Sequence, residues 1–178
     1  MNTSARIGIV TVVGEDMKKV SKNEKKAWMS RGLDRKREYY KLCREHRARL
    51  ETAAKCTPSY GGIVVAGSSN PHKFERVAMI HDDIEENLNE IERIRREIKK
   101  AIITLKVPAD SKIKPETVEG MKNVLFERYV NFREFKDIAP KYNYSEGHVY
   151  VLHRQGLEHI RISRAMIEHS AAKKKKTH

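Results

Sequence analysis

The sequence predicts an all-α protein, in which a long antiparallel helical hairpin with coiled-coil character precedes a small helix-turn-helix domain. Residues 21–55 have a helix-forming composition, and residues from about 70 to 106 have seven-residue apolar repeats. Neither stretch has a proline in its interior. A cluster of turn-forming residues separates them. Near the C-terminus, a short helical pattern, a tight turn and a capped helical pattern follow one another.

The composition indicates an elongated, basic protein. Charged residues make up 34% of the 178 residues, above the usual share of about 25%. The net charge is +13, and the excess lies in residues 1–60 (15 Lys and Arg against 7 Asp and Glu) and 109–178 (14 against 9). Because basic proteins of this kind usually meet phosphate, we expect a nucleic-acid partner. A basic surface that serves only solubility is the alternative.

Cysteine usage and hydropathy favour a cytoplasmic protein. Cys43 and Cys56 do not form a C-x-x-C pair, so we expect free thiols in a reducing compartment. The N-terminus lacks the features of a secretory signal. No apolar run approaches ~18 residues, so we expect no membrane partner.

The first 55 residues divide into a predicted arm and a predicted helix. Residues 1–20 contain one short β-prone run, residues 7–13, which is compatible with a flexible arm that pairs with another segment or with a disordered arm. Residues 21–55 have no proline and many helix formers. Their apolar stripe is moderate and comprises Leu33, Tyr40, Cys43, Leu50 and Ala54.

A turn-rich connector follows at residues 57–71. Its Gly and Pro residues are Pro58, Gly61, Gly62, Gly67 and Pro71. A phosphate-binding glycine loop would need the spacing G-x-x-x-x-G-K-[ST], which is not present here. We therefore interpret this segment as a connector between two helices.

The second long helix carries the strongest periodic signal. Ser69 or Asn70 can cap it, and it should stop before Pro108. Its seven-residue repeat predicts a coiled-coil seam that forms a homo-oligomer, with an asparagine that fixes register. Packing of the same stripe on the first helix is the alternative. Both kinds of packing can occur in one protein, as an antiparallel hairpin that also oligomerises. The predicted oligomerisation residues are Val77, Ile80, Ile84, Asn87, Ile91, Ile94, Ile98 and Leu105.

Three helical segments follow, at 116–130, about 132–142 and 145 to about 168. Asn143 suits the left-handed conformation of a tight turn, and Ser145 is a good N-cap. Val149, Leu152, Leu157 and Ile160 recur at helical spacing and should face inward with Ile138 and Ala139.

The opposite side of the last segment predicts contact with double-stranded DNA. In a helix-turn-helix, the second helix lies in the major groove and its first turns face the bases. Glutamate can accept from cytosine, tyrosine and valine can touch a thymine methyl group, and arginine or histidine can reach phosphate or guanine. A domain used for protein contact is the alternative. The predicted DNA-binding residues are Ser145, Glu146, Gly147, His148, Tyr150, Val151, Arg154 and the run Lys173, Lys174, Lys175 and Lys176.

The chain resembles a family of phage proteins. Its C-terminal half looks like the sigma-factor region-4-like domain of the ArpU and RinA-type late regulators. The residues that carry this resemblance are 125–130, Phe132, Phe135, Ile138-Ala139, Tyr144-Ser145 and 148–153. Residues 54–57 and 82–98 are similar to the hairpin of that family. The resemblance covers about residues 49–162. It implies a transcription activator of late, packaging or lysis genes in the bacterial host cytoplasm. Glu146, Gly147, Tyr150 and Val151 depart from the Arg and His common at these positions, and Pro140 is unusual.

The predicted division of the chain is therefore an arm at 1–20, a hairpin that oligomerises at 21–108, a sigma region-4-like DNA-binding domain at 109–168 and a basic tail at 169–178. No histidine or cysteine set has the spacing of a zinc site, so we expect no metal and no cofactor. No nucleophile and base are signalled, so we expect no enzyme. Two rival functions remain: a small-terminase-like packaging protein that forms a ring, and an interaction protein that binds RNA polymerase or a virion component.

Overall fold

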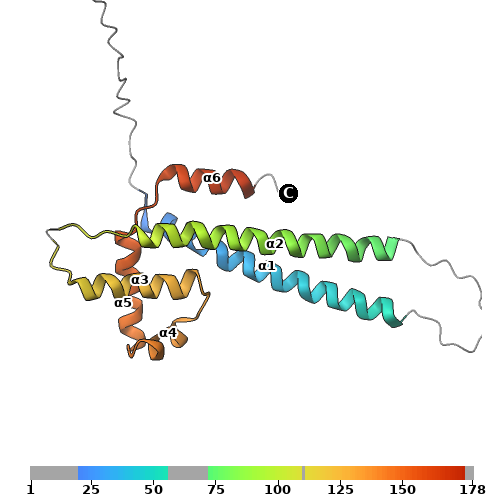
Figure 1. The fold of residues 1–178 in the computed structure, drawn as a ribbon, viewed down its shortest axis with the longest axis horizontal. Coiled ribbons are helices and arrows are strands. Elements are labelled where there is room, and N and C mark those ends of the chain that lie inside the picture. The colour runs from blue at the N-terminus through green and yellow to red at the C-terminus, as the bar shows by residue number, and fades with distance from the viewer. Residues whose placement is uncertain (1–19, 56–71, 110, 175–178) are drawn as a thin grey trace, which may run out of the picture.

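The computed structural model describes residues 20–55, 72–109 and 111–174, and every regular element in these ranges is an α-helix. The predicted all-α class is therefore confirmed for the described residues. The predicted arm, apart from Val20, and the connector at 57–71 lie outside them. Figure 1 shows the helices α1 (Lys22–Lys55), α2 (His72–Ile103), α3 (Pro115–Tyr129), α4 (Phe135–Lys141), α5 (Glu146–His159) and α6 (Arg164–Lys174).

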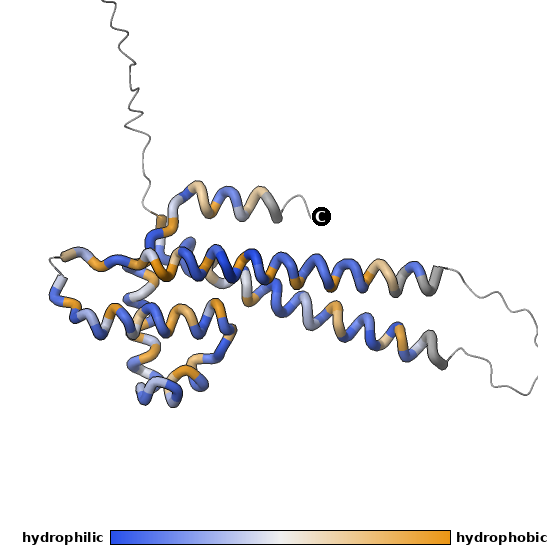
Figure 2. The backbone as a smooth tube through the Cα atoms, in the orientation of Figure 1, coloured by the Kyte–Doolittle hydropathy of each residue, from blue (hydrophilic) through white to orange (hydrophobic). Residues whose placement is uncertain are grey.

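The two long helices, α1 and α2, lie side by side and run in opposite directions (Figure 1). A capping box begins α1: the Ser21 hydroxyl accepts a hydrogen bond from the Glu24 amide (3.2 Å), and the Glu24 carboxylate accepts one from the Ser21 amide (2.8 Å). The far halves of α1 and α2 extend beyond the rest of the fold. Figure 2 shows that hydrophilic residues dominate this extended part of α2.

The main core lies where the α1–α2 pair meets α3 and the end of α5. Trp28 and Met29 of α1, which the sequence stripe did not include, are buried there. They pack with α2, α3 and the segment after α5, and the buried members from these parts are Ile94, Ile98, Ala101, Ile102, Leu105, Leu125, Tyr129, Val130, Leu157, Ile160 and Ile162.

A second, smaller core holds α3, α4 and the first half of α5 together. Its buried residues are Met121, Val124, Ile138, Ala139, Val149 and Leu152. In Figure 1, α5 runs across α3, and its N-terminal end lies with α4, away from α2 and α6. This end of the fold is therefore the part least covered by the long helices.

Two predicted boundaries are wrong. The helix expected from Ser145 to about residue 168 is two helices, because Ile160 is extended (φ −64°, ψ 137°) and both Ile160 and Ile162 turn into the main core. The Ser163 hydroxyl then accepts from the Met166 amide (3.3 Å) and begins α6. Since α6 continues to Lys174, the expected tail at 169–178 is helical over its first six positions.

Candidate nucleic-acid interface

A tight turn presents the N-terminal end of α5. The turn spans residues 142–145, and Asn143 has a positive φ of 54°, as its residue type predicts. The Tyr144 amide donates to the Ala139 carbonyl (2.9 Å), which ties the turn to α4. The Ser145 hydroxyl accepts from the His148 amide (3.2 Å), so the predicted N-cap forms.

One side of α5 is buried, and it is the predicted side. Val149, Leu152, Leu157 and Ile160 are at most 2% exposed. They pack on α3, on α4 and on the main core. The burial of this side fixes which side chains of α5 face outward.

The outward side of α5 contains the residues predicted to contact DNA. Tyr150 is 51% exposed and Val151 is 41% exposed, which is unusual for large apolar side chains. We call the exposed residues the α5 face; they are Glu146, Gly147, His148, Tyr150, Val151 and Arg154.

Gly147 has no packing role inside the molecule. A Cβ atom added there would meet nothing within 4 Å, whereas a Cβ at Gly156 would lie 2.9 Å from Leu125 Cδ1. A glycine in a helix costs roughly 0.5–1 kcal/mol relative to alanine. The close approach of α5 to α3 explains why position 156 is a glycine. At position 147 no contact with the described residues requires a glycine, although glycine lowers the stability of the helix. An open glycine of this kind allows another molecule to approach the backbone closely.

An aromatic stack supports one flank of the α5 face. The ring of Tyr150 lies 4.7 Å from the ring of Phe135 in α4, measured between centroids, and the Arg128 guanidinium of α3 lies 4.9 Å from the centre of the same Phe135 ring. This contact holds Tyr150 in a fixed place although half of it is exposed. Sequence analysis assigned no role to Phe135 or Arg128 in the interface.

Beneath the α5 face lies a neutral buried pair that the sequence did not predict. The Tyr129 hydroxyl and His153 Nε2 share a hydrogen bond of 2.8 Å. Burial, together with the positive charges of Lys26 and Arg128, lowers the pKa of His153 to about 4. Burial likewise raises the pKa of Tyr129 to about 12. His153 is therefore an uncharged structural residue at neutral pH and not part of the exposed face.

A buried carboxylate joins α3 to the turn before α5. Glu127 is 2% exposed and forms ion pairs with Lys141 and with Arg133, where Arg133 Nε lies 3.1 Å from Glu127 Oε2. The Tyr142 hydroxyl donates to the same carboxylate (3.2 Å). Burial favours the neutral carboxyl, but hydrogen bonds from Lys141 and from Asn131 outweigh this and hold the pKa of Glu127 below its ordinary value. Glu127 thus fixes both ends of α4 relative to α3.

The described part of the lysine run lies away from the α5 face. Lys173 and Lys174 belong to α6, whereas Lys175 and Lys176 lie outside the described residues. In Figure 1, α6 lies on the opposite side of α2 from α4 and the N-terminal end of α5. The structure therefore separates Lys173 and Lys174 from the residues of the α5 face.

The predicted oligomerisation stripe is largely buried within one chain. Ile94, Ile98 and Leu105 are at most 3% exposed and belong to the main core, and Leu105 lies beyond the end of α2. These side chains therefore pack on α1, α3 and α5 and are not free to form a seam with another copy. Ile80 and Ile91 are also buried, Ile84 and Asn87 are half-buried, and the side chain of Val77 is not described. Homo-oligomer formation stays a prediction.

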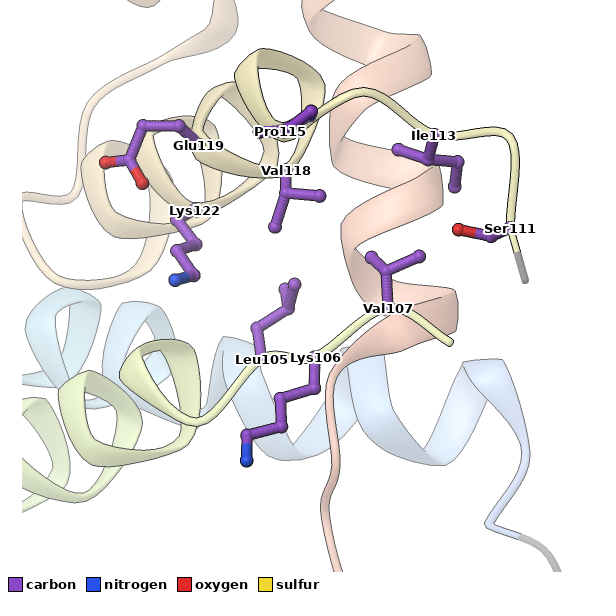
Figure 3. Close-up of a pocket in the computed structure, with 9 residues that line it drawn as sticks. All are labelled: Leu105, Lys106, Val107, Ser111, Ile113, Pro115, Val118, Glu119 and Lys122. Carbon is purple, nitrogen blue, oxygen red and sulfur yellow. The ribbon is translucent and has the colours of Figure 1, made fainter. Parts of the chain in front are cut away.

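A surface hollow lies away from the α5 face. It has a volume of about 430 Å³ and is formed by the segment after α2 and the first turns of α3. Figure 3 shows Leu105 and Val118 pointing toward each other across it, with Lys106 and Lys122 at its rim. Its lining is mixed, with Glu119 and Ser111 as further polar groups.

Within residues 20–55, 72–109 and 111–174, no three His, Cys, Asp or Glu side chains are grouped so that they could hold a metal ion. None of the helices in the described part of the chain combines the length and apolar composition needed to cross a bilayer. No family model, curated protein or solved structure matches this chain, so the resemblance to late phage regulators stays a prediction.

Proposed function

We propose that this chain binds double-stranded DNA by placing the α5 face in the major groove, with α4 and α5 acting as a helix-turn-helix. The observation that carries the proposal is the outward exposure of the first two turns of α5 behind a four-residue turn. The open glycine at position 147 and the half-exposed Tyr150 and Val151 support it, because groove-facing residues must leave surface free for the bases.

The side chains of the α5 face suit base and phosphate contacts. Glu146 can accept a hydrogen bond from the cytosine amino group, and Tyr150 and Val151 can pack on thymine methyl groups. Arg154, one turn further along, can reach guanine or phosphate. A good base contact contributes about 1–3 kcal/mol of discrimination, so two or three such contacts suffice for sequence preference.

The resemblance to the ArpU and RinA-type regulators extends the proposal to a phage transcription regulator of late, packaging or lysis genes. In this role the α1–α2 pair acts as an antiparallel hairpin that holds copies together through surfaces other than Ile94, Ile98 and Leu105, which are buried within one chain. RNA polymerase is a second candidate partner. A two-copy assembly would read two half-sites about one helical turn apart. A ring of many copies in a solution-mass measurement would favour the small-terminase-like function instead.

Selection of bound sequences from a random duplex library tests the proposal. The wild type should enrich a defined motif, and genome-wide mapping of bound DNA should find the same motif. Tyr150→Ala and Arg154→Ala should weaken binding to that motif, and Gly147→Ala should do so because a methyl group then enters the groove-facing surface. Arg37→Ala, near the middle of α1, is the matched control and should leave binding unchanged. Retention of the motif and affinity in all three α5 variants would refute the assignment of the recognition helix.

A further inference from the structure

Three cations from three different helices border the same flank of the α5 face. Arg154 lies on α5 itself, Arg128 on α3 and Lys26 on α1. Among the residues that the structure describes, none of these three forms an ion pair with a carboxylate. Lys26 and Arg154 are exposed, and Arg128 is half-buried.

The position of Lys26 follows from its neighbours on α1. Lys22, one turn earlier, forms an ion pair with Glu158 near the end of α5 (2.6 Å), and Lys25 donates to the Glu158 carbonyl (2.9 Å). Residues four apart on a helix share one side, so Lys26 lies on the same side of α1 as Lys22. The first turns of α1 are therefore docked beside α5, and Lys26 stands at the edge of that contact.

The position of Arg128 follows from the aromatic stack. Its guanidinium lies over Phe135, whose other neighbours are Tyr150 (4.7 Å) and His153 (5.0 Å). Arg128 also donates to the Arg133 carbonyl (3.0 Å), which holds its side chain in place. Tyr150 and Phe135 thus form an aromatic surface with Arg128 against it.

Two exposed cations further along α1 differ from this set. Arg37 pairs with Asp34 (3.4 Å) and Lys41 pairs with Glu38 (3.7 Å), each on its own helix. Close to α5, by contrast, Lys26, Arg128 and Arg154 form no direct ion pair in the described part of the chain, although the charges of Arg128 and Arg154 help to lower the pKa of Glu134 and of Glu158. Cations without a direct ion pair, beside the exposed Tyr150 and the half-buried Phe135, suit the sugar–phosphate backbone of DNA.

We propose that Lys26, Arg128 and Arg154 bind phosphates of one DNA strand, while Tyr150 and Phe135 pack against the sugars or base edges between them. This rests on the proposed function and adds residues that the helix-turn-helix alone does not supply. It makes the first turns of α1 part of the DNA interface. One end of the α1–α2 pair is then fixed relative to the duplex, and the far half of the pair extends beyond the rest of the fold.

The salt dependence of binding tests the proposal. Each phosphate contact contributes roughly 0.9 to the slope of log K against log salt concentration for duplex DNA. Binding of the full chain to the selected duplex is measured by fluorescence anisotropy at several salt concentrations. The slope of log K against log salt concentration should be shallower than the wild-type slope by about 0.9 for Lys26→Gln and for Arg128→Gln. Both variants should weaken binding to the selected and to a scrambled duplex by a similar factor, because phosphate contacts do not depend on sequence.

Matched variants separate charge from structure. Arg128→Lys keeps the charge and should keep the wild-type slope, whereas Arg37→Gln and Lys41→Gln should not change it. Circular dichroism spectra should confirm that each variant keeps its helix content. A wild-type slope in both Lys26→Gln and Arg128→Gln, in a protein that binds the duplex, would overturn this proposal and leave the proposed function standing. No binding of duplex DNA by the wild type would overturn both.

Discussion

The two glycines of α5 give opposite predictions for the same substitution. At Gly147 an added Cβ meets nothing within 4 Å, so Gly147→Ala should gain helix propensity without a steric cost. At Gly156 the added Cβ would lie 2.9 Å from Leu125 Cδ1 and 3.1 Å from Leu125 Cγ. Leu125 is fully buried and cannot move aside easily, so Gly156→Ala should overpack the contact between α3 and α5.

The magnitudes follow from these two environments. Alanine is favoured over glycine in a helix by roughly 0.5–1 kcal/mol, and Gly147 is in the first turn, so we expect a gain of about 0.5 kcal/mol in the free energy of unfolding. Overpacking costs about 1–3 kcal/mol, which exceeds the gain in propensity, so Gly156→Ala should lose about 1 kcal/mol.

Urea unfolding followed by circular dichroism at 222 nm measures both changes from the shift in midpoint at constant slope. The two variants differ by one methyl group in the same helix, so each is the control for the other. Equal stabilisation by both substitutions would show that α5 does not approach α3 as described. Destabilisation by Gly147→Ala would show that the α5 face is covered within the protein.

Three further predictions concern the groups that hold α5 in place. The pKa of His153 is about 4 in the folded chain and near 6.5 when unfolded, so the free energy of unfolding should fall by about 3 kcal/mol as the pH drops from above 6.5 to about 4. His153→Gln, which cannot titrate, should flatten that part of the unfolding curve; an unchanged pH profile would contradict the burial of His153. Glu127→Gln weakens two charged hydrogen bonds and should lower the free energy of unfolding by about 2 kcal/mol at pH 7. Thermal melting measures this loss, and an unchanged melting temperature would show that the carboxylate is solvated. Ser145→Ala removes the cap of α5 and should cost about 1 kcal/mol, whereas Ser145→Asp should restore most of it.

Local signals predicted the start of α5 correctly. Asn143 adopts the left-handed conformation and Ser145 caps the helix, and both preferences belong to the residues themselves. The end of α5 was missed because no glycine or proline marks it. Ile160 and Ile162 leave the helix to fill the main core, which is a tertiary effect, although Ser163 as the next cap is a signal in the sequence.

Periodicity predicted which side of α2 is buried but not what buries it. The seven-residue stripe is the same whether the partner is another copy or α1 of the same chain. Trp28 and Met29, which cover its proximal part, stand outside the apolar stripe proposed for α1.

For the polar residues Glu127 and Lys26, the sequence likewise does not reveal which residues they contact in the fold. Glu127 is buried by partners up to 15 positions away, and Lys26 reaches the neighbourhood of α5 only through the packing of α1. Neither sequence neighbourhood contains a signal for these contacts.

The central claim is that the α5 face contacts duplex DNA, and NMR of the full chain with increasing amounts of the selected duplex tests it most directly. The account predicts that the amide signals of residues 146–154 and the methyl signals of Val151 shift most, together with the first turn of α1. Shifts confined to the far halves of α1 and α2, with residues 146–154 unaffected at saturation, would contradict it.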